Sequence, residues 1–308
     1  MKTKNIPQIL PVFCRGIQPW ILAVTLSTTI ASNALASTPT TDEIGVTQAP
    51  LSAKTTLNVA YYVPSGCHHR AILMVFASKN RDYKAFRDES IPLAQESCSV
   101  LFAPEFSLNA YPPRAYQRGG FPENPEAPSP ARLVIPLEEW AKRFILDTSL
   151  PVILIGHSAG AQFLNRVAAY TIGSENGIIL MNPGSTVEPS FDIAVPYGFG
   201  GEWSALEASR ALKAYLARPV FFLLGSEDTK TASFSGNAQA EVMAEGTNRL
   251  QRGSNTFAVG RSLARKNGAS FNWRIAIVPN VGHDDALMLS SPVLEQTVAA
   301  IINRGSLR

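Results

Sequence analysis

The sequence predicts an α/β fold in which a mostly parallel sheet is covered by helices on both faces. Short apolar runs of strand length alternate with helical stretches along most of the chain. One apolar run, 150–155, leads through a glycine-rich turn into a helix of small residues, as a buried parallel strand does. We find no internal repeat and no sign of a second globular domain in the sequence.

The expected elements follow one another in a regular order. The strands are expected at 56–63, 70–77, 98–104, 150–157, 177–182, 219–225 and 273–279. The helices are expected at 83–95, 137–146, 159–170, 206–217, 239–252, 256–265 and 286–302. Helices between consecutive strands return the chain to the same edge of the sheet, so most strands should be parallel.

Ser158 lies in the turn that ends the apolar run. The turn reads Gly156-His-Ser-Ala-Gly160. Its two glycines allow a sharp reversal, and a strained backbone at the serine would expose the hydroxyl. Because Gly-x-Ser-x-Gly also occurs by chance, the preceding strand and the following helix carry the prediction that Ser158 is a nucleophile. An ordinary glycine-rich turn is the alternative.

The general base is identified by elimination among four histidines. A serine nucleophile needs a base, which is normally histidine. His157 is next to Ser158 in the chain, so its side chain cannot face the same way. His68 and His69 precede a strand and belong to the opposite end of a parallel sheet. His283 follows a strand and is expected at the carboxyl edge, where open α/β sheets build their sites. A surface histidine is the alternative interpretation.

The acid is expected between Ser158 and His283, because folds with this turn use the chain order serine, acid, histidine. The strand 219–225 ends in Ser-Glu227-Asp228. Asp228 would hold one imidazole tautomer and stabilise the imidazolium. Glu227 is the close competitor, and a solvated turn acid is the alternative interpretation of Asp228.

Over residues 55–305 the chain resembles the α/β-hydrolases, and more narrowly secreted or polyester-depolymerase-like serine hydrolases. The matching segments are Val100-Leu-Phe-Ala-Pro-Glu-Phe106, Gly156-His-Ser-Ala-Gly160, Pro196-Tyr-Gly-Phe-Gly-Gly201, Gly246-Thr-Asn-Arg-Leu-Gln-Arg-Gly253 and Val278-Pro-Asn-Val-Gly-His283. The resemblance implies an α/β-hydrolase fold with Ser158, Asp228 and His283 as the catalytic triad. The short segment before Asp228 leaves no room for a large cap domain.

Two backbone N–H groups should bind the oxyanion. The N–H of Ala159, the residue after the nucleophile, is the first donor. The second comes from the loop after the strand 70–77, where relatives usually carry His-Gly and this chain has Ala77-Ser78. Because a backbone N–H serves whatever the side chain, Ala77 and Ser78 are both candidates.

Two long loops, 105–131 and 183–203, are expected to border the substrate pocket. They carry aromatic residues and prolines but few charges, which favours an apolar or aromatic acyl or alcohol group. The candidate pocket residues are Tyr111, Tyr116, Tyr197, Phe199 and Trp203, each equally compatible with packing inside the loop. Without a large cap the site should be open, which suits bulky or polymeric esters.

Residues 1–36 have the three parts of a signal peptide. They have a basic start, an apolar stretch at 20–26, and Ala-Leu-Ala directly before Ser37. Cleavage would leave a flexible segment, 37–54, and a catalytic domain, 55–308. The protein is then expected in the periplasm or outside the cell, without stable membrane association. An uncleaved N-terminal anchor is the alternative.

The charge balance argues against nucleic acid as a partner. The chain has 27 Lys and Arg against 24 Asp and Glu. Three of the basic residues, Lys2, Lys4 and Arg15, lie in the leader, so 24 basic and 24 acidic residues are left after cleavage. No basic stripe with interleaved aromatics is present in the sequence. The glycine-rich phosphate motifs are absent from it as well, and no metal or organic cofactor is implied.

Cys67 and Cys98 would be the cysteines left after cleavage, and an oxidising compartment favours their pairing. Each precedes a strand, and in the expected fold these strands are parallel neighbours. Both cysteines therefore belong at the edge away from the site. A metal cluster of Cys67 with His68 and His69 is the alternative, but it lacks the spacing of a fourth ligand.

The reaction expected from this combination is hydrolysis of a carboxylic ester through an acyl-enzyme. Three alternatives stay open: an amide or peptide substrate, acyl transfer to an alcohol, and a silent binding module of the same fold. The complete serine, acid and histidine set argues against the silent module, since such a relative is free to lose any of the three.

Overall fold

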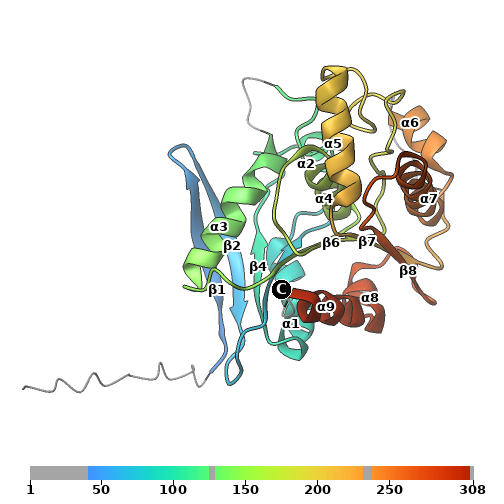
Figure 1. Ribbon diagram of the computed structural model, residues 1–308. Helices are drawn as coiled ribbons and strands as arrows, with labels where there is room; N and C mark the ends of the chain where they lie inside the picture. Colours follow the sequence, from blue (N-terminus) through green and yellow to red (C-terminus); the bar gives the residue numbers. More distant parts are fainter. Residues whose placement is uncertain (1–40, 125–128, 232–237, 306–308) are drawn as a thin grey trace, which may run out of the picture. The chain divides into compact units, whose positions relative to one another are not determined.

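A single eight-stranded sheet organises the residues that this computed structural model describes, 41–124, 129–231 and 238–305 (Figure 1). The strands are β1 (Glu43–Ser52), β2 (Thr55–Val63), β3 (Ala71–Phe76), β4 (Ser99–Pro104), β5 (Val152–His157), β6 (Gly177–Met181), β7 (Val220–Gly225) and β8 (Arg274–Val278). Their order is β1-β2-β4-β3-β5-β6-β7-β8. Strand β2 pairs antiparallel with both β1 and β4, and the other neighbouring strands pair in parallel. The predicted α/β class is confirmed.

Helices cover both faces of this sheet (Figure 1). One face carries α1 (Tyr83–Glu96), α8 (Asp285–Leu289) and α9 (Pro292–Gly305). The other carries α3 (Val134–Phe144), α4 (Ala159–Tyr170), α5 (Ala205–Ala217) and α7 (Arg249–Asn267). Three short helices lie in the connections: α2 (Pro113–Gln117), the 3-10 helix η1 (Pro130–Leu133) and α6 (Ala238–Glu245).

The central strands read as unbroken apolar runs because both of their faces are covered. Every residue of β3, β4, β5, β6 and β7 is buried. Successive side chains point to opposite faces, so Ile72 and Met74 join the core under α3 to α5 while Leu73 and Val75 join the core over α1 and α9. The sheet therefore has a hydrophobic core on each of its two faces.

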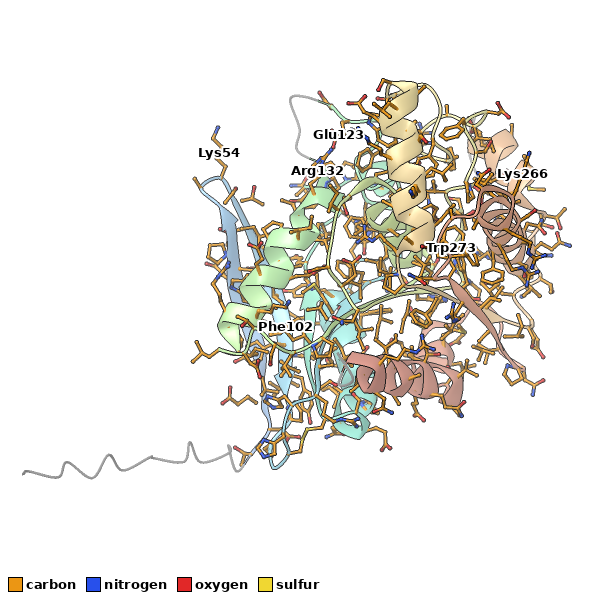
Figure 2. All side chains as sticks on the ribbon, in the orientation of Figure 1. Lys54, Phe102, Glu123, Arg132, Lys266 and Trp273 are labelled. Carbon is orange, nitrogen blue, oxygen red and sulfur yellow. A yellow bond between two sulfur atoms is a disulfide. The ribbon has the colours of Figure 1, made fainter. Side chains whose placement is uncertain are left out.

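Large aromatic side chains tie the helices to the sheet (Figure 2). Phe102 on β4 packs edge-on against Trp140 and Phe144 of α3, with ring centroids 5.4 and 5.6 Å away. Trp273, which precedes β8, packs against Tyr215 of α5 at 4.5 Å, and its Nε1–H donates to the Tyr215 carbonyl oxygen. These contacts fix the helices that flank the strands leading to the site.

The flexible segment predicted for 37–54 is wrong over Glu43–Ser52, which form β1. This strand pairs with β2 from Glu43 opposite Val63 to Ser52 opposite Thr55. Only Ala49 in β1 is buried. An edge strand with one buried residue needs no continuous apolar run, which is why its sequence reads as a loop. The predicted signal peptide, 1–36, lies outside the described residues.

Two helix boundaries also differ from the prediction. The break expected between 252 and 256 lies instead before Arg249, because the Asn248 side chain caps α7 by accepting the Gln251 N–H at 2.9 Å. The single helix expected over 286–302 is divided into α8 and α9, the second of which begins at Pro292. Proline fits the first turn of a helix but interrupts one that has already begun.

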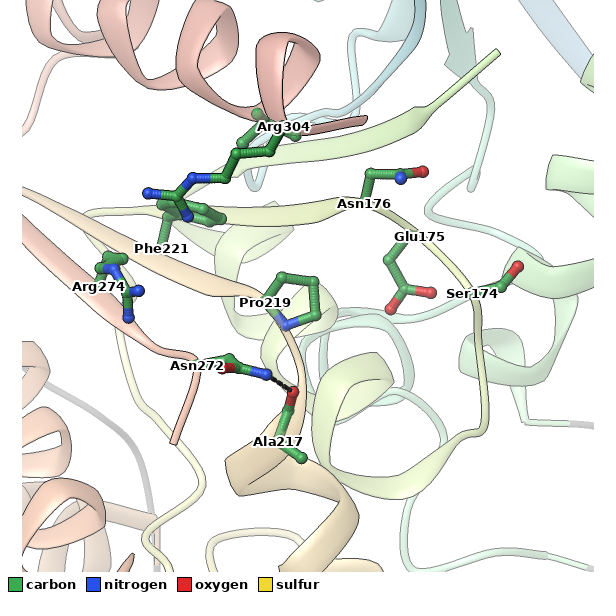
Figure 3. Close-up of a pocket in the computed structure, with 10 residues that line it drawn as sticks. Ser174, Glu175, Asn176, Ala217, Pro219, Phe221, Asn272, Arg274 and Arg304 are labelled. Carbon is green, nitrogen blue, oxygen red and sulfur yellow. Dashed lines mark hydrogen bonds between the residues drawn. The ribbon is translucent and has the colours of Figure 1, made fainter. Parts of the chain in front are cut away.

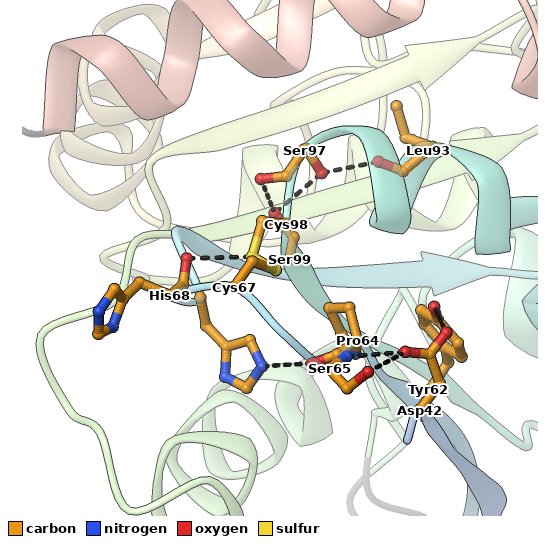
Figure 4. Close-up of a disulfide and its surroundings, with 11 residues drawn as sticks. Asp42, Tyr62, Pro64, Ser65, Cys67, His68, Leu93, Ser97, Cys98 and Ser99 are labelled. Carbon is orange, nitrogen blue, oxygen red and sulfur yellow. Dashed lines mark hydrogen bonds between the residues drawn. A yellow bond between two sulfur atoms is a disulfide. The ribbon is translucent and has the colours of Figure 1, made fainter. Parts of the chain in front are cut away.

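The predicted Cys67–Cys98 disulfide is confirmed (Figure 4). Its Cα atoms lie 6.3 Å apart. The bridge joins the residues that lead into β3 and β4, which are parallel neighbours with Ala71 opposite Ser99. It therefore lies at the amino edge of the parallel strands. Among the described residues, no helix combines the length and the apolar composition that a membrane crossing requires.

Candidate active site

Ser158 occupies a strained turn between β5 and α4. Its φ of +53° and ψ of −108° are unusual for a residue with a side chain. The flanking glycines are required by close packing of the backbone. A Cβ at Gly156 would collide with the backbone of Gly160, and a Cβ at Gly160 would collide with the Phe76 carbonyl oxygen. The sequence thus folds into the predicted nucleophile elbow.

A chain of hydrogen bonds joins Ser158, His283 and Asp228. Nδ1 of His283 lies 2.8 Å from Oδ2 of Asp228, and Nε2 lies 2.9 Å from Oγ of Ser158. A carboxylate can only accept, so Nδ1 carries the proton and donates it. Nε2 is then free to accept the hydrogen of the Ser158 hydroxyl. The structure brings together the three residues that the sequence predicts as a triad, in the arrangement that a general base requires.

The geometry separates Asp228 from its competitor Glu227. The Asp228 side chain is only 1% exposed and contacts His283, whereas Glu227 is exposed. The two loops that carry the acid and the histidine are bound to each other. The Glu227 N–H donates to the Val281 carbonyl oxygen at 2.9 Å, and the Asn280 N–H donates to Oγ of Ser226 at 2.8 Å.

Asn182 is a site residue that the sequence reasoning missed. It follows β6 directly and is fully buried. Its Nδ2 donates to the Gly282 carbonyl oxygen at 3.0 Å, and its Oδ1 accepts the Gly225 N–H at 2.8 Å. One side chain therefore joins the loop of the acid to the loop of His283. A polar residue closing the apolar run 177–181 is the signal that could have drawn attention to it.

Arg249 is a second residue of the candidate site to which the sequence analysis assigned no role. It is the first residue of α7, and its Nη1 donates to Oδ1 of Asp228 at 3.3 Å. The Leu250 N–H points at the backbone oxygen of Asp228 at 3.4 Å. The two carboxylate oxygens of Asp228 thus have different partners, His283 on one side and Arg249 on the other.

His157 packs beneath the His283 ring without joining the hydrogen-bonded chain. The two ring centroids lie 4.8 Å apart, and Nδ1 of His157 is 3.1 Å from Oγ of Ser78. Burial lowers the pKa of His157 well below its usual value, and the charges of His283 and Arg249 lower it further. His157 is therefore an uncharged neighbour of the His283 ring.

The candidate oxyanion donors come from the start of α4 and from the loop after β3. Ala159 is the first residue of α4, where the N–H has no acceptor within the helix. In the loop after β3, the Tyr116 hydroxyl donates to the Ala77 carbonyl oxygen at 3.0 Å. Because the peptide is trans, the Ser78 N–H points away from Tyr116. The Arg81 guanidinium stacks on the Tyr116 ring at 3.7 Å and holds this loop in place.

The five aromatic residues predicted to line the substrate pocket do not lie in one pocket. Tyr116 and Phe199 are each 1% exposed and belong to the core. Tyr197 is also buried. Tyr111 lines a cavity of about 530 Å³, and Trp203 lines a different one of about 500 Å³ beside α5. The loops fold back on the protein, so Tyr116 and Phe199 join the core against the sheet, and Tyr197 packs with Val242 of α6.

A polar cavity of about 460 Å³ lies at the opposite edge of the sheet (Figure 3). Its lining residues precede or begin β6, β7 and β8, or belong to α9: Ser174, Glu175, Asn176, Ala217, Pro219, Phe221, Asn272, Arg274, Ile301 and Arg304. Ser158, Asp228 and His283 follow the carboxyl ends of the strands and are separate from it. Within the described ranges, no group of three or more His, Cys, Asp or Glu side chains is placed to hold a metal ion.

No protein-family model matches the chain, and no curated protein does so either. Solved structures match it. Poly(aspartic acid) hydrolase-1 from Sphingomonas sp. KT-1 is 25% identical with a TM-score of 0.73, over 85% of this chain and 98% of that one. The poly(3-hydroxybutyrate) depolymerase LpqC from Bordetella parapertussis is 24% identical with a TM-score of 0.73, over 85% and 94%.

A more distant match extends the same comparison. The fluorophosphonate-binding serine hydrolase F of Staphylococcus aureus is 12% identical with a TM-score of 0.53, over 85% of this chain and 99% of that one. Each of the three similarities covers 85% of this chain.

Proposed function

We propose that this protein, which has the α/β-hydrolase fold, is a serine hydrolase that cleaves carboxylic ester bonds through an acyl-enzyme on Ser158. The observation that carries the proposal is the hydrogen-bonded chain from Ser158 through His283 to Asp228, with the serine in a strained elbow. The hydrolases among the similar structures support the reaction type.

In the first half of the proposed reaction, Oγ of Ser158 attacks the ester carbonyl carbon while its proton passes to Nε2 of His283. The Ala159 and Ser78 N–H groups bind the developing oxyanion. Asp228 stabilises the imidazolium through Nδ1. Collapse of the tetrahedral intermediate breaks the bond to the alcohol oxygen, which takes the proton from Nε2 as it leaves.

In the second half, water attacks the acyl-enzyme. His283 takes one proton from the water, and the oxyanion contacts form again. The second collapse breaks the bond between the acyl group and Oγ of Ser158, which recovers its proton from Nε2. The products are a carboxylic acid and an alcohol, and the transfers between Ser158 and His283 use atoms that lie 2.9 Å apart.

We propose a polymeric or bulky ester as the substrate class. One similar structure is named as a depolymerase of poly(3-hydroxybutyrate), which is a polyester, and this supports the ester. Another is named as a hydrolase of poly(aspartic acid), which is a polyamide, so it supports a polymeric substrate but not the ester bond. The His283 side chain is 30% exposed, which supports access by a large substrate. We expect no nucleic acid and no stable membrane partner.

We also propose that residues 1–36 are removed during export to the periplasm or the medium. The Cys67–Cys98 disulfide supports this proposal, since such bonds persist in oxidising compartments. The mature protein purified from an exporting host should begin near Ser37. Intact-mass analysis should show a form lighter by the two thiol hydrogens than the reduced form. An intact leader or two free thiols would contradict the proposal.

The proposed activity is tested by labelling with a fluorophosphonate probe, followed by hydrolysis of p-nitrophenyl esters of increasing acyl length. We expect S158A to lose both labelling and hydrolysis and to keep the wild-type circular dichroism spectrum. The matched control is S262A, which changes an exposed serine on α7. Full labelling of S158A would refute the nucleophile.

The same assay separates the neighbouring activities. Anilide and peptide substrates report an amidase, and added alcohol reports an acyltransferase by the appearance of a new ester. Wild-type protein that neither labels nor hydrolyses any of these substrates would support the silent binding module and contradict the proposed function.

A further inference from the structure

The acid of the triad is a buried carboxylate with two different partners. Asp228 is 1% exposed, Oδ2 faces Nδ1 of His283, and Oδ1 faces the guanidinium of Arg249. A buried charge without a compensating charge is strongly unfavourable. In the resting enzyme His283 must be neutral to act as a base, so it supplies no positive charge. Arg249 supplies one at all working pH values.

Arg249 stands at a position of α7 where the helix itself does not favour a cation, so its contact with Asp228 explains why an arginine is present. Arg249 is the first residue of a 19-residue helix. A cation at this end opposes the helix dipole, which favours acidic residues in the first turn. Helix stability therefore does not account for an arginine here. The side chain is 18% exposed, so it is also largely withdrawn from solvent.

We propose that Arg249 is a positioning residue for the catalytic acid. It keeps Asp228 ionised with Oδ2 directed at His283 while the imidazole is neutral, and so sets the lower pH limit of activity. Without Arg249, a protonated His283 would supply the positive charge next to the buried carboxylate. The imidazole would then stay protonated, and inactive as a base, up to a higher pH. This inference rests on the proposed function.

Other titratable groups belong to the elements that carry or border the Asp228–His283 pair, and none of them replaces Arg249 as the balancing charge. They are His157 from the end of β5, Arg252 from α7, and Glu227, Asp284 and Asp285 from the loops of the pair. His157 is uncharged, as argued above. Glu227, Asp284 and Asp285 are anions, so they cannot balance the charge of a buried carboxylate. Arg252 donates through Nη1 to the Gly246 carbonyl oxygen, and the charges that favour its protonated form are Glu245 first and Asp228 second. Arg249 is the cation in hydrogen-bond contact with Asp228 in the described structure.

The test is the pH profile of kcat/KM for a p-nitrophenyl ester in wild type, R249Q, R249K and R265Q. In R249Q the acid limb should move to higher pH by about one unit, with the activity lost near neutrality recovered in alkali. R249K keeps the charge and should keep the limb closer to wild type. R265Q changes an exposed arginine in the last turn of the same helix and should have no effect.

A loss of activity in R249Q that is equal at all pH values, with the limb unmoved, would overturn the proposal, because a merely structural role predicts that result. The labelling rate with the fluorophosphonate probe, followed against pH, gives the same readout for slow variants. In a D228N background, R249Q should no longer move the limb, since the charge that it balances is gone.

Stability gives a second test should R249Q fold poorly. D228N/R249Q leaves no uncompensated carboxylate and should be as stable as D228N in urea denaturation. A double variant no more stable than R249Q would overturn the proposal. Failure of the proposed function is distinguished by the wild type. If Ser158 is not labelled, the function is wrong; if it is labelled and R249Q behaves as wild type, only the role of Arg249 is wrong.

Discussion

Removal of the disulfide should cost stability without changing the chemistry. The variant is C67S/C98S, which leaves no single thiol to exchange. The bridge joins residues 31 apart in the chain, and for a loop of this length the chain-entropy estimate gives about 3.7 kcal/mol at 25 °C. A folded unit of about 260 residues unfolds with an entropy of about 0.55 kcal/mol per kelvin, so Tm should fall by about 7 °C.

The assay pairs thermal denaturation, followed by circular dichroism, with ester hydrolysis at 25 °C. The bridge precedes β3 and β4, whereas Ser158 follows the opposite end of β5. Hydrolysis at 25 °C should therefore match the wild type. Wild-type protein treated with reductant is the matched control and should melt with the variant. A Tm within 2 °C of the wild type, or a kcat that falls along with Tm, would refute this reasoning.

Two further predictions concern buried carboxyl groups. D228N should lower kcat by about four orders of magnitude because an amide favours the wrong imidazole tautomer, while E227Q should be near wild type; steady-state kinetics of both variants checks this. Burial raises the pKa of Glu245 from 4.5 to about 7, with Arg166 opposing the shift. The folded protein then binds this proton more tightly than the unfolded chain, so the contribution to stability is full below about pH 4.5 and is lost as pH rises to about 7. Between pH 5 and pH 8 the unfolding free energy of E245Q should therefore fall less than that of the wild type, by up to about 3 kcal/mol. Urea titration of both proteins at each pH measures the difference. An equal decline in both proteins would exclude Glu245 as its source.

The sequence is most informative where burial is two-sided. The runs that became β3 to β7 are buried at every position, so their apolar character is continuous and visible. The edge strand β1 has one buried residue and was mistaken for a flexible segment. Composition alone does not predict an edge strand such as β1, because its conformation is determined by pairing with the neighbouring strand β2.

The same distinction applies within the site. Ser158, Asp228 and His283 could be predicted, because each follows an apolar strand and the chain order is characteristic. Asn182 could not, since its two contacts reach 43 and 100 residues along the chain. The pocket aromatics could not either. A tyrosine in a proline-rich loop has the same sequence signature whether it faces a ligand or, like Tyr116, the core.

The candidate site has two halves that meet at Ser158, and a different set of hydrogen bonds holds each half. In one half, Asn182 links the loops of the acid and the histidine. In the other, Tyr116 holds the carbonyl of Ala77 and thereby the direction of the Ser78 N–H. The elbow joins them, because Gly160 packs directly against the Phe76 carbonyl oxygen at the end of β3. The proposed proton transfer and oxyanion binding therefore depend on different hydrogen bonds, and His157, which contacts both Ser78 and the His283 ring, connects the two halves. Changes in the first half should alter how the rate depends on pH, whereas changes in the second should lower kcat equally at every pH.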